Sequence, residues 1–111
     1  MNARFIILTV TPAGQPKSKH YTLQLQQEDK LISLNCNSLT IDLGERSLKI
    51  TDALIAYNNH GRITHPELHQ WIIEKNLNNT PARNPAKLIF SILVKKNTHR
   101  LLLYPYQANL L

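Results

Sequence analysis

The feature that most constrains the fold is a period-two alternation of apolar and polar residues in the first half of the chain. In the stretch LTIDLGERSLKIT, residues 39–51, this alternation runs up to Gly44 and Glu45 and resumes after them. Such alternation buries one side of a strand and leaves the other in water, which is typical of antiparallel sheets. A glycine followed by one residue between two strands predicts a two-residue turn of type II′.

Similar patterns predict further strands on both sides of this hairpin. The second and third segments in the list below alternate and are joined by a polar turn, which predicts another hairpin. The fourth is apolar on both faces and predicts a central strand, with the fifth returning as its partner. Pro105 places the end of that last strand at a sheet edge. The predicted strands are residues 4–11, 20–27, 30–37, 87–96 and 100–107.

The pattern changes to a helical period after Thr64. Thr64 followed by Glu67 predicts a capping box, and Pro66 is tolerated in the first turn, so a helix is expected over residues 65–77. Its buried face is expected to consist of Leu68, Trp71, Ile72, Ile73 and Leu77, with His65 and His69 at its margin.

A second, shorter helix over residues 51–59 is expected to end at Gly61, although a strand over 53–57 fits that composition nearly as well. Together these elements predict an α+β fold, with a mostly antiparallel sheet of six to eight short strands and one or two helices. The 111 residues have the length of one domain, so residues 1–111 are expected to form a single domain without disulfide or metal staples.

The net charge of +6 is unevenly distributed along the chain. Residues 1–27 carry three basic residues and no acid, and residues 28–74 carry four basic and seven acidic residues. From Lys75 onward there are six basic residues and no Asp or Glu. An asymmetry of this kind is typical of a surface that binds a polyanion or an acidic protein, although a basic surface also serves solubility alone.

Most of the C-terminal charge belongs to the predicted hairpin of residues 87–107. On strand alternation Arg100, Leu102, Tyr104 and Tyr106 share one face, which places basic and aromatic side chains together. The candidate binding residues are therefore Lys95, Lys96, His99, Arg100, Tyr104 and Tyr106.

Cysteine content and the N-terminal sequence bear on the cellular compartment. Cys36 is the single cysteine and cannot form an internal disulfide, and its alternation with apolar neighbours predicts a buried, unreactive thiol. The first residues lack the pattern of a signal peptide, and their apolar run is too short to cross a bilayer. A cytoplasmic protein without membrane contact is therefore expected.

The motifs of metal and catalytic sites are incomplete. His65 and His69 have the spacing of two zinc ligands on one helix, but Pro-Glu-Leu separates them, so the zinc-protease motif is absent. The three glycines form no phosphate-binding loop. No metal, no cofactor and no enzymatic activity are expected, although a site assembled from scattered histidines such as His20, His60 and His99 stays open.

These observations favour a non-catalytic binding protein. We expect its basic C-terminal hairpin to dock on an acidic surface of a protein partner, as a small inhibitor, immunity protein or adaptor does. The alternative is an RNA or single-stranded DNA binding protein that uses the same hairpin, with bases stacked on its tyrosines. DNA binding through the predicted helix 65–77 is disfavoured, because its polar face carries Glu67 and Glu74.

Overall fold

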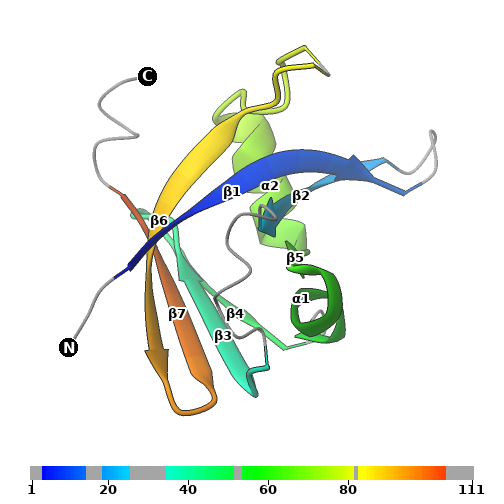
Figure 1. The fold of residues 1–111 in the computed structure, drawn as a ribbon. Coiled ribbons are helices and arrows are strands. Elements are labelled where there is room, and N and C mark those ends of the chain that lie inside the picture. The colour runs from blue at the N-terminus through cyan, green and yellow to red at the C-terminus, as the bar shows by residue number, and fades with distance from the viewer. Residues whose placement is uncertain (1–3, 15–18, 26–34, 52–53, 82, 105–111) are drawn as a thin grey trace.

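The computed structural model describes residues 4–14, 19–25, 35–51, 54–81 and 83–104 (Figure 1). Within these ranges it contains seven strands and two helices. The strands are β1 (Arg4–Ala13), β2 (His20–Leu25), β3 (Ser38–Asp42), β4 (Ser47–Ile50), β5 (Arg62–Ile63), β6 (Lys87–Lys95) and β7 (Thr98–Leu103), and the helices are α1 (Leu54–His60) and α2 (Pro66–Glu74).

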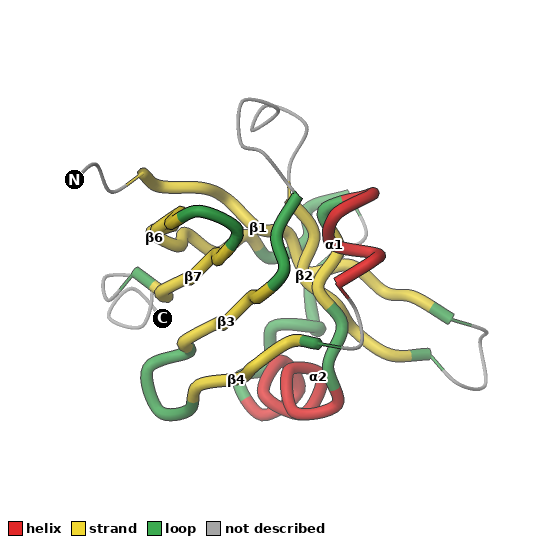
Figure 2. The backbone as a smooth tube through the Cα atoms, turned by 90° about the horizontal axis from the view of Figure 1, so that it is seen from below, coloured by secondary structure: helices red, strands yellow, loops and turns green. Residues whose placement is uncertain are grey.

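All seven strands belong to one sheet, in the order β4-β3-β7-β6-β1-β2-β5. Only the pairing of β3 with β7 is parallel, so the expected α+β class with a mostly antiparallel sheet is confirmed. The sheet curves into an incomplete barrel, with the two helices lying to one side of it (Figures 1 and 2). Strand β7 lies between β3 and β6, and its pairing with β3 extends to Leu102, so the described residues do not reach the predicted edge position at Pro105. Pro105 itself lies outside the described residues.

Helix α2 connects opposite parts of the curved sheet. His69 Nδ1 accepts a hydrogen bond of 3.0 Å from the backbone N–H of Tyr21 in β2. At its other end, Glu74 forms an ion pair of 3.1 Å with Arg46 in the turn between β3 and β4. Lys75 forms a second ion pair with that turn, through the carboxylate of Glu45. The helix therefore spans from β2 to the β3–β4 hairpin.

The core lies between the concave face of the sheet and the two helices. Strand alternation supplies one set of inward side chains, and α1 and α2 supply the other. As predicted, Leu68, Trp71 and Ile72 of α2 are buried, with Trp71 only 3% exposed. Tyr57 of α1 is fully buried in the same core. The buried strand residues include Ile6, Leu8, Val10, Leu23, Leu39, Ile41, Leu48, Ile50, Leu88, Phe90, Ile92 and Leu101.

The N-terminal cap of α2 differs from the prediction. His65, not Thr64, has the extended backbone of an N-cap, and its Nδ1 accepts a hydrogen bond of 3.1 Å from the N–H of Glu67. The imidazole of His65 thus caps the helix in place of the hydroxyl of Thr64, one residue further along the chain. The predicted capping box of Thr64 and Glu67 is therefore wrong.

The C-terminal end of α2 is set by Asn76, which has a positive φ of 59°. The N–H of Leu77 bonds to Ile72 O and that of Asn76 bonds to Ile73 O, the two bonds of a Schellman motif. The helix consequently ends before the predicted residue 77. Leu77 is buried as expected, whereas Ile73 is 44% exposed and the prediction that it widens the buried face is wrong.

Two glycines act as the sequence predicts. Gly61 has a φ of +71° and its N–H bonds to Tyr57 O, which ends α1, so the helical alternative for this segment is confirmed. A Cβ at position 61 would lie 2.9 Å from Leu25 Cβ. Gly44 has a φ of +94° at the first central position of the β3–β4 turn, as a type II′ turn requires.

The predicted hairpin between residues 20–27 and 30–37 lies largely outside the described residues, since residues 26–34 are not described. The described pairings of β2 are with β1 and β5. The predicted C-terminal hairpin is confirmed as β6 and β7, joined at Lys96 and Asn97.

Candidate functional site

The face of the sheet that is turned away from the core, here called the outer face, carries three of the six predicted binding residues: Lys95, Arg100 and Tyr104. Along β1 the buried Ile6 and Leu8 alternate with Phe5 and Ile7, which are 58% and 36% exposed. Along β7 the buried Leu101 is followed by the half-buried Leu102 and preceded by the exposed Arg100. Successive residues of a strand point to opposite faces, so one set of side chains builds the core and the other builds the outer face.

The strand register places the outward residues in rows across the sheet. These rows combine β1, β6, β7, β3 and β4, which are neighbours in space but distant in sequence. Three consecutive rows are Ile7, Ile89 and Tyr104; Phe5, Ser91, Leu102 and Asp42; and Leu93, Arg100, Thr40 and Lys49.

The centre of the outer face is apolar. Phe5 and Tyr104 contact each other edge to face, with ring centroids 5.1 Å apart and an interplanar angle of 82°. The aliphatic side chains around them are half-buried or exposed, although they lie in the middle strands of the sheet. We call this cluster the outer patch; it consists of Phe5, Ile7, Ile89, Leu93, Leu102 and Tyr104.

Exposed cations flank the outer patch on several sides. Lys87 precedes Ile89 along β6 at one end, and Arg100 and Lys95 lie at the other end, near the turn of the β6–β7 hairpin. Lys49 extends the row of Arg100 to the edge strand β4. We call these four residues the basic rim: Lys49, Lys87, Lys95 and Arg100.

Acidic residues are scarce on the outer face. Among the described outward residues of these strands, Asp42 is the only acid, and its Oδ1 accepts a hydrogen bond of 2.8 Å from the N–H of Gly44. Glu45 and Glu74 belong instead to the ion pairs between the β3–β4 turn and α2. Lys75 holds the pKa of Glu45 below its usual value through that contact. Among the described residues, therefore, no carboxylate forms an ion pair with the basic rim.

The six predicted binding residues do not lie together. Lys95, Arg100 and Tyr104 lie on the outer face, and Lys96 lies at the hairpin turn with a φ of 53°. Tyr106 lies outside the described residues. His99 is fully buried on the core side of β7, so its expected place in the basic cluster is corrected.

The prediction missed Phe5 and Ile7, the most exposed side chains of the outer patch. Their signal is present in the sequence, because a strand that is apolar at consecutive positions presents apolar side chains on both faces. Such a strand needs a covering layer on each side, and only one of its sides faces the core here.

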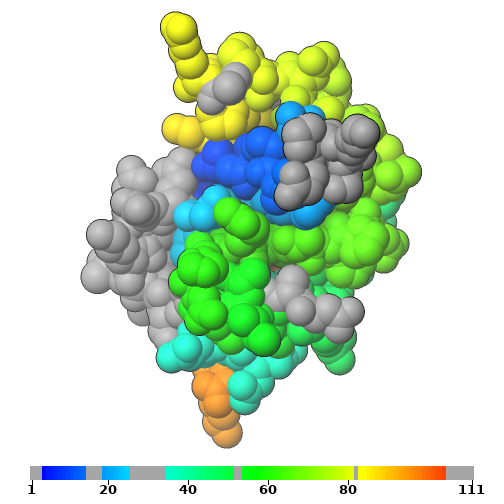
Figure 3. Space-filling view, turned by 90° about the vertical axis from the view of Figure 1, so that its right-hand side faces the viewer, coloured from blue at the N-terminus to red at the C-terminus, as the bar shows by residue number. Residues whose placement is uncertain are grey.

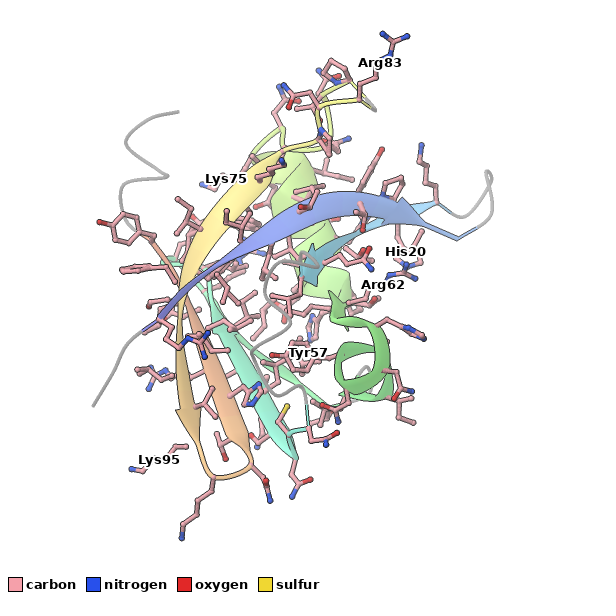
Figure 4. All side chains as sticks on the ribbon, in the orientation of Figure 1. His20, Tyr57, Arg62, Lys75, Arg83 and Lys95 are labelled. Carbon is pink, nitrogen blue, oxygen red and sulfur yellow. The ribbon has the colours of Figure 1, made fainter. Side chains whose placement is uncertain are left out.

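The tip of the hairpin projects from one end of the molecule (Figure 3). Lys95 lies there, on the side of the hairpin away from Tyr57 and α1, and Arg83 lies at the opposite end (Figure 4). The tip is held by the carbonyl of Asn97, which accepts hydrogen bonds from Asn37 N at 2.6 Å and Ser38 N at 3.3 Å. The basic side chains are therefore exposed on an anchored turn.

A separate cleft of about 350 Å³ lies between the far ends of β1 and β2 and the connector that follows α2. Tyr21 lines it, with its ring stacked on His69 at 5.9 Å and the ammonium of Lys19 at 5.9 Å from the ring centroid. The other lining residues are Val10, Thr11, Pro12, Leu77, Asn78, Thr80, Pro81 and Pro85. This set contains no carboxylate, thiol or free imidazole arranged for catalysis.

The described residues contain no cluster of three or more His, Cys, Asp or Glu side chains suited to a metal ion. Cys36 is buried, and burial raises the pKa of its thiol, which keeps it protonated. In the same described ranges, no helix has the length and apolar character required to cross a lipid bilayer.

Comparison of the chain with models of protein families, with curated proteins and with solved structures finds no match.

Proposed function

We propose that the protein is a non-catalytic binding protein whose outer face docks on an acidic surface of a protein partner. The observation that carries this proposal is the exposure of Phe5 and Ile7 in the middle of the sheet, beside a basic rim with a single described acid. Apolar side chains surrounded by charged ones are the usual anatomy of a protein interface. A rim of one sign favours a partner of the opposite sign and speeds its approach.

A protein partner fits the outer patch better than a nucleic acid. Four of its six side chains are aliphatic, namely Ile7, Ile89, Leu93 and Leu102, and aliphatic side chains offer no ring on which a base can stack. Its two rings, Phe5 and Tyr104, already contact each other edge to face. The cations then act mainly as a rim that steers and orients the partner.

The dimensions of the outer face suit a modest interface. Five adjacent strands measure about 19 Å across, and the rows from Lys87 to Lys95 measure about 27 Å along the strands. The resulting area of about 500 Å² lies below the roughly 800 Å² per partner of a standard complex. This area is in the range of transient complexes. We therefore expect the affinity to depend strongly on the outer patch.

The partner can be captured from the native host and identified by mass spectrometry, and its binding can then be measured with purified variants. Replacing Lys95, Lys96 and Arg100 by Glu is expected to abolish binding, since charge reversal opposes the acidic partner while disturbing little packing. Phe5→Ala is expected to accelerate dissociation instead, because it removes an apolar contact at the centre.

A matched pair of single variants provides the control. Arg100→Glu and Arg83→Glu change the net charge equally, and both side chains are exposed, but only Arg100 lies on the outer face. Arg100→Glu should slow association several-fold, and Arg83→Glu should leave it unchanged. Equal effects of the two variants would show that net charge, not the outer face, governs binding.

The same triple variant distinguishes a nucleic-acid partner. If the protein binds single-stranded RNA or DNA instead, the purified protein carries an elevated 260-to-280 nm ratio. Removing three phosphate contacts would then reduce the magnitude of the log–log salt slope by roughly two to three. If the triple variant binds both the protein partner and single-stranded nucleic acid as the wild type does, the hairpin is not part of the binding site.

A further inference from the structure

The core contains one polar pair that the binding proposal does not use. The hydroxyl of Tyr57 in α1 and Nδ1 of His99 in β7 lie 2.8 Å apart, and both side chains have no solvent exposure. Their rings contact each other edge to face, with centroids 5.7 Å apart at 84°. This contact joins α1 directly to the strand that bears Arg100 on its opposite face.

The hydrogen bonding of His99 suits a neutral ring only. Nδ1 contacts the Tyr57 hydroxyl, whereas Nε2 has no hydrogen-bond partner among the described residues. A neutral imidazole carries one N–H, which on Nδ1 would donate to the Tyr57 hydroxyl and leave Nε2 without a proton. A protonated ring carries two N–H groups, so the second N–H would be buried without an acceptor.

The surroundings of His99 do not compensate a positive charge. The strand neighbours of His99 are Val94 in β6 and Leu39 in β3, which are apolar. Among the described residues, Tyr57 is the titratable group in contact with His99, and Cys36 interacts with Tyr57; burial raises the pKa of both, so both are neutral. No carboxylate among the described residues contributes to its electrostatic environment, and burial lowers the pKa of His99 itself. An imidazolium here would be an unpaired charge in the core.

The contacts of α1 extend from this pair to the hairpin tip. Asn58, next to Tyr57, accepts from Cys36 N with Oδ1 and donates to Cys36 O with Nδ2, both at 3.0 Å. The backbone N–H of Asn37, the residue after Cys36, donates a hydrogen bond to the carbonyl of Asn97 at the hairpin tip. Helix α1, the segment of residues 35–37 and the β6–β7 turn thus form one connected unit.

We propose that the His99–Tyr57 pair is a pH-sensitive lock, in which the neutral imidazole holds α1 against β7 and its protonation in mild acid releases α1 and loosens the hairpin tip. This lock is a property of the free protein and does not depend on the proposed binding function. A buried histidine that gains a charge is a common way to bias a fold between two states.

The direction of the pH effect follows from the neutral folded state. The unfolded chain binds a proton at His99 with a pKa of about 6.5, whereas the folded chain takes up that proton only at lower pH. The contribution to stability is therefore complete above about pH 6.5 and is lost as the pH falls toward the lower folded value. Within this window, each decrease of one pH unit raises the equilibrium constant for release of α1 by up to about tenfold.

Amide hydrogen exchange of the wild-type protein at pH 7.5 and 5.5 tests the lock. After correction for intrinsic rates, the protection of α1 amides should fall about tenfold more than that of the buried turn of α2 around Trp71. An equal loss in both helices would indicate general acid unfolding, and equal protection at the two pH values would indicate that no release occurs. Either result would overturn the proposal.

Two variants assign the effect to His99. His99→Asn keeps an amide near the position of Nδ1 but cannot titrate, so the selective loss of α1 protection at pH 5.5 should disappear. His60→Asn is the matched control, since His60 lies at the end of α1 with an exposed ring, and it should behave as wild type. If His99→Asn does not fold, the wild-type comparison of α1 with α2 still decides. A folded His99→Asn variant with the wild-type pH profile would contradict the lock.

Discussion

Replacing Trp71 by alanine tests the packing on which the fold depends. The indole is 3% exposed, and a buried Trp side chain removes about 200 Å² from water. At roughly 25 cal/mol per Å² this corresponds to about 5 kcal/mol, an upper value because the unfolded chain also buries part of its surface. We therefore expect Trp71→Ala to lower the free energy of unfolding by about 3 to 5 kcal/mol.

The other attachments of α2 are too weak to replace this contact. A helix of nine residues is not stable alone in water, so α2 depends on its contacts with the sheet. The ion pair of Arg46 with Glu74 is largely solvent-exposed, with 30% and 48% of the two side chains accessible, and such pairs contribute little. The hydrogen bond of His69 to Tyr21 N contributes about 1 kcal/mol.

Urea unfolding followed by far-UV circular dichroism measures the loss, because Trp71 is the single tryptophan and the variant lacks indole fluorescence. Ile73→Ala is the control on the same helix; its side chain is 44% exposed, and we expect a loss below about 1 kcal/mol. A loss for Trp71→Ala no larger than that for Ile73→Ala would refute the assignment of the indole to the core.

Two further predictions use matched substitutions. His65→Ala should lower stability by about 1 kcal/mol in the same urea assay, because it removes the acceptor that caps α2, whereas Thr64→Ala should be nearly neutral; the reverse order would restore Thr64 as the cap. Gly61→Ala should cost more than Gly44→Ala, since both positions have a positive φ but only at Gly61 would the new Cβ lie 2.9 Å from Leu25. Equal losses for the two glycine variants would show that backbone strain alone, without the close contact, determines the cost.

The elements set by local chemistry were predictable from the sequence. The hairpin around Gly44 and the end of α1 at Gly61 follow from backbone conformations that glycine adopts easily. The buried face of α2 follows from the helical spacing of Leu68, Trp71 and Ile72. These patterns depend on residues within one or two turns of each other, so they are visible in a single sequence.

The arrangement of the strands was not predictable in the same way. The parallel pairing of β3 with β7 joins residues about sixty positions apart, and no local pattern encodes it. The position of β7 in the interior of the sheet depends on that pairing. The exposure of Ile73, by contrast, follows from the helical period, since at 100° per residue Ile73 lies about 140° from Leu68, away from the buried face of α2.

The candidate site was predictable only in part. Alternation placed Arg100, Leu102 and Tyr104 on one face, and the structure confirms that they share it. The patch is completed by Phe5 and Ile7 from the other end of the chain, which reach it through the pairing of β1 with β6. A site that combines distant strands requires the sheet order before its members can be recognised.

His99 shows why clustering in sequence is a poor guide to clustering in space on a strand. His99 and Arg100 are adjacent and both basic in type, but neighbouring residues of a strand point to opposite faces. His99 and Leu101 are two positions apart and both are buried in the core. Arg100 and Leu102 alternate with them and lie on the outer face. The side chains of His99 and Arg100 therefore lie on opposite faces of β7. A substitution of Arg100 should alter partner binding without altering the pH dependence of α1, and His99→Asn should do the opposite, so the two proposals can fail independently.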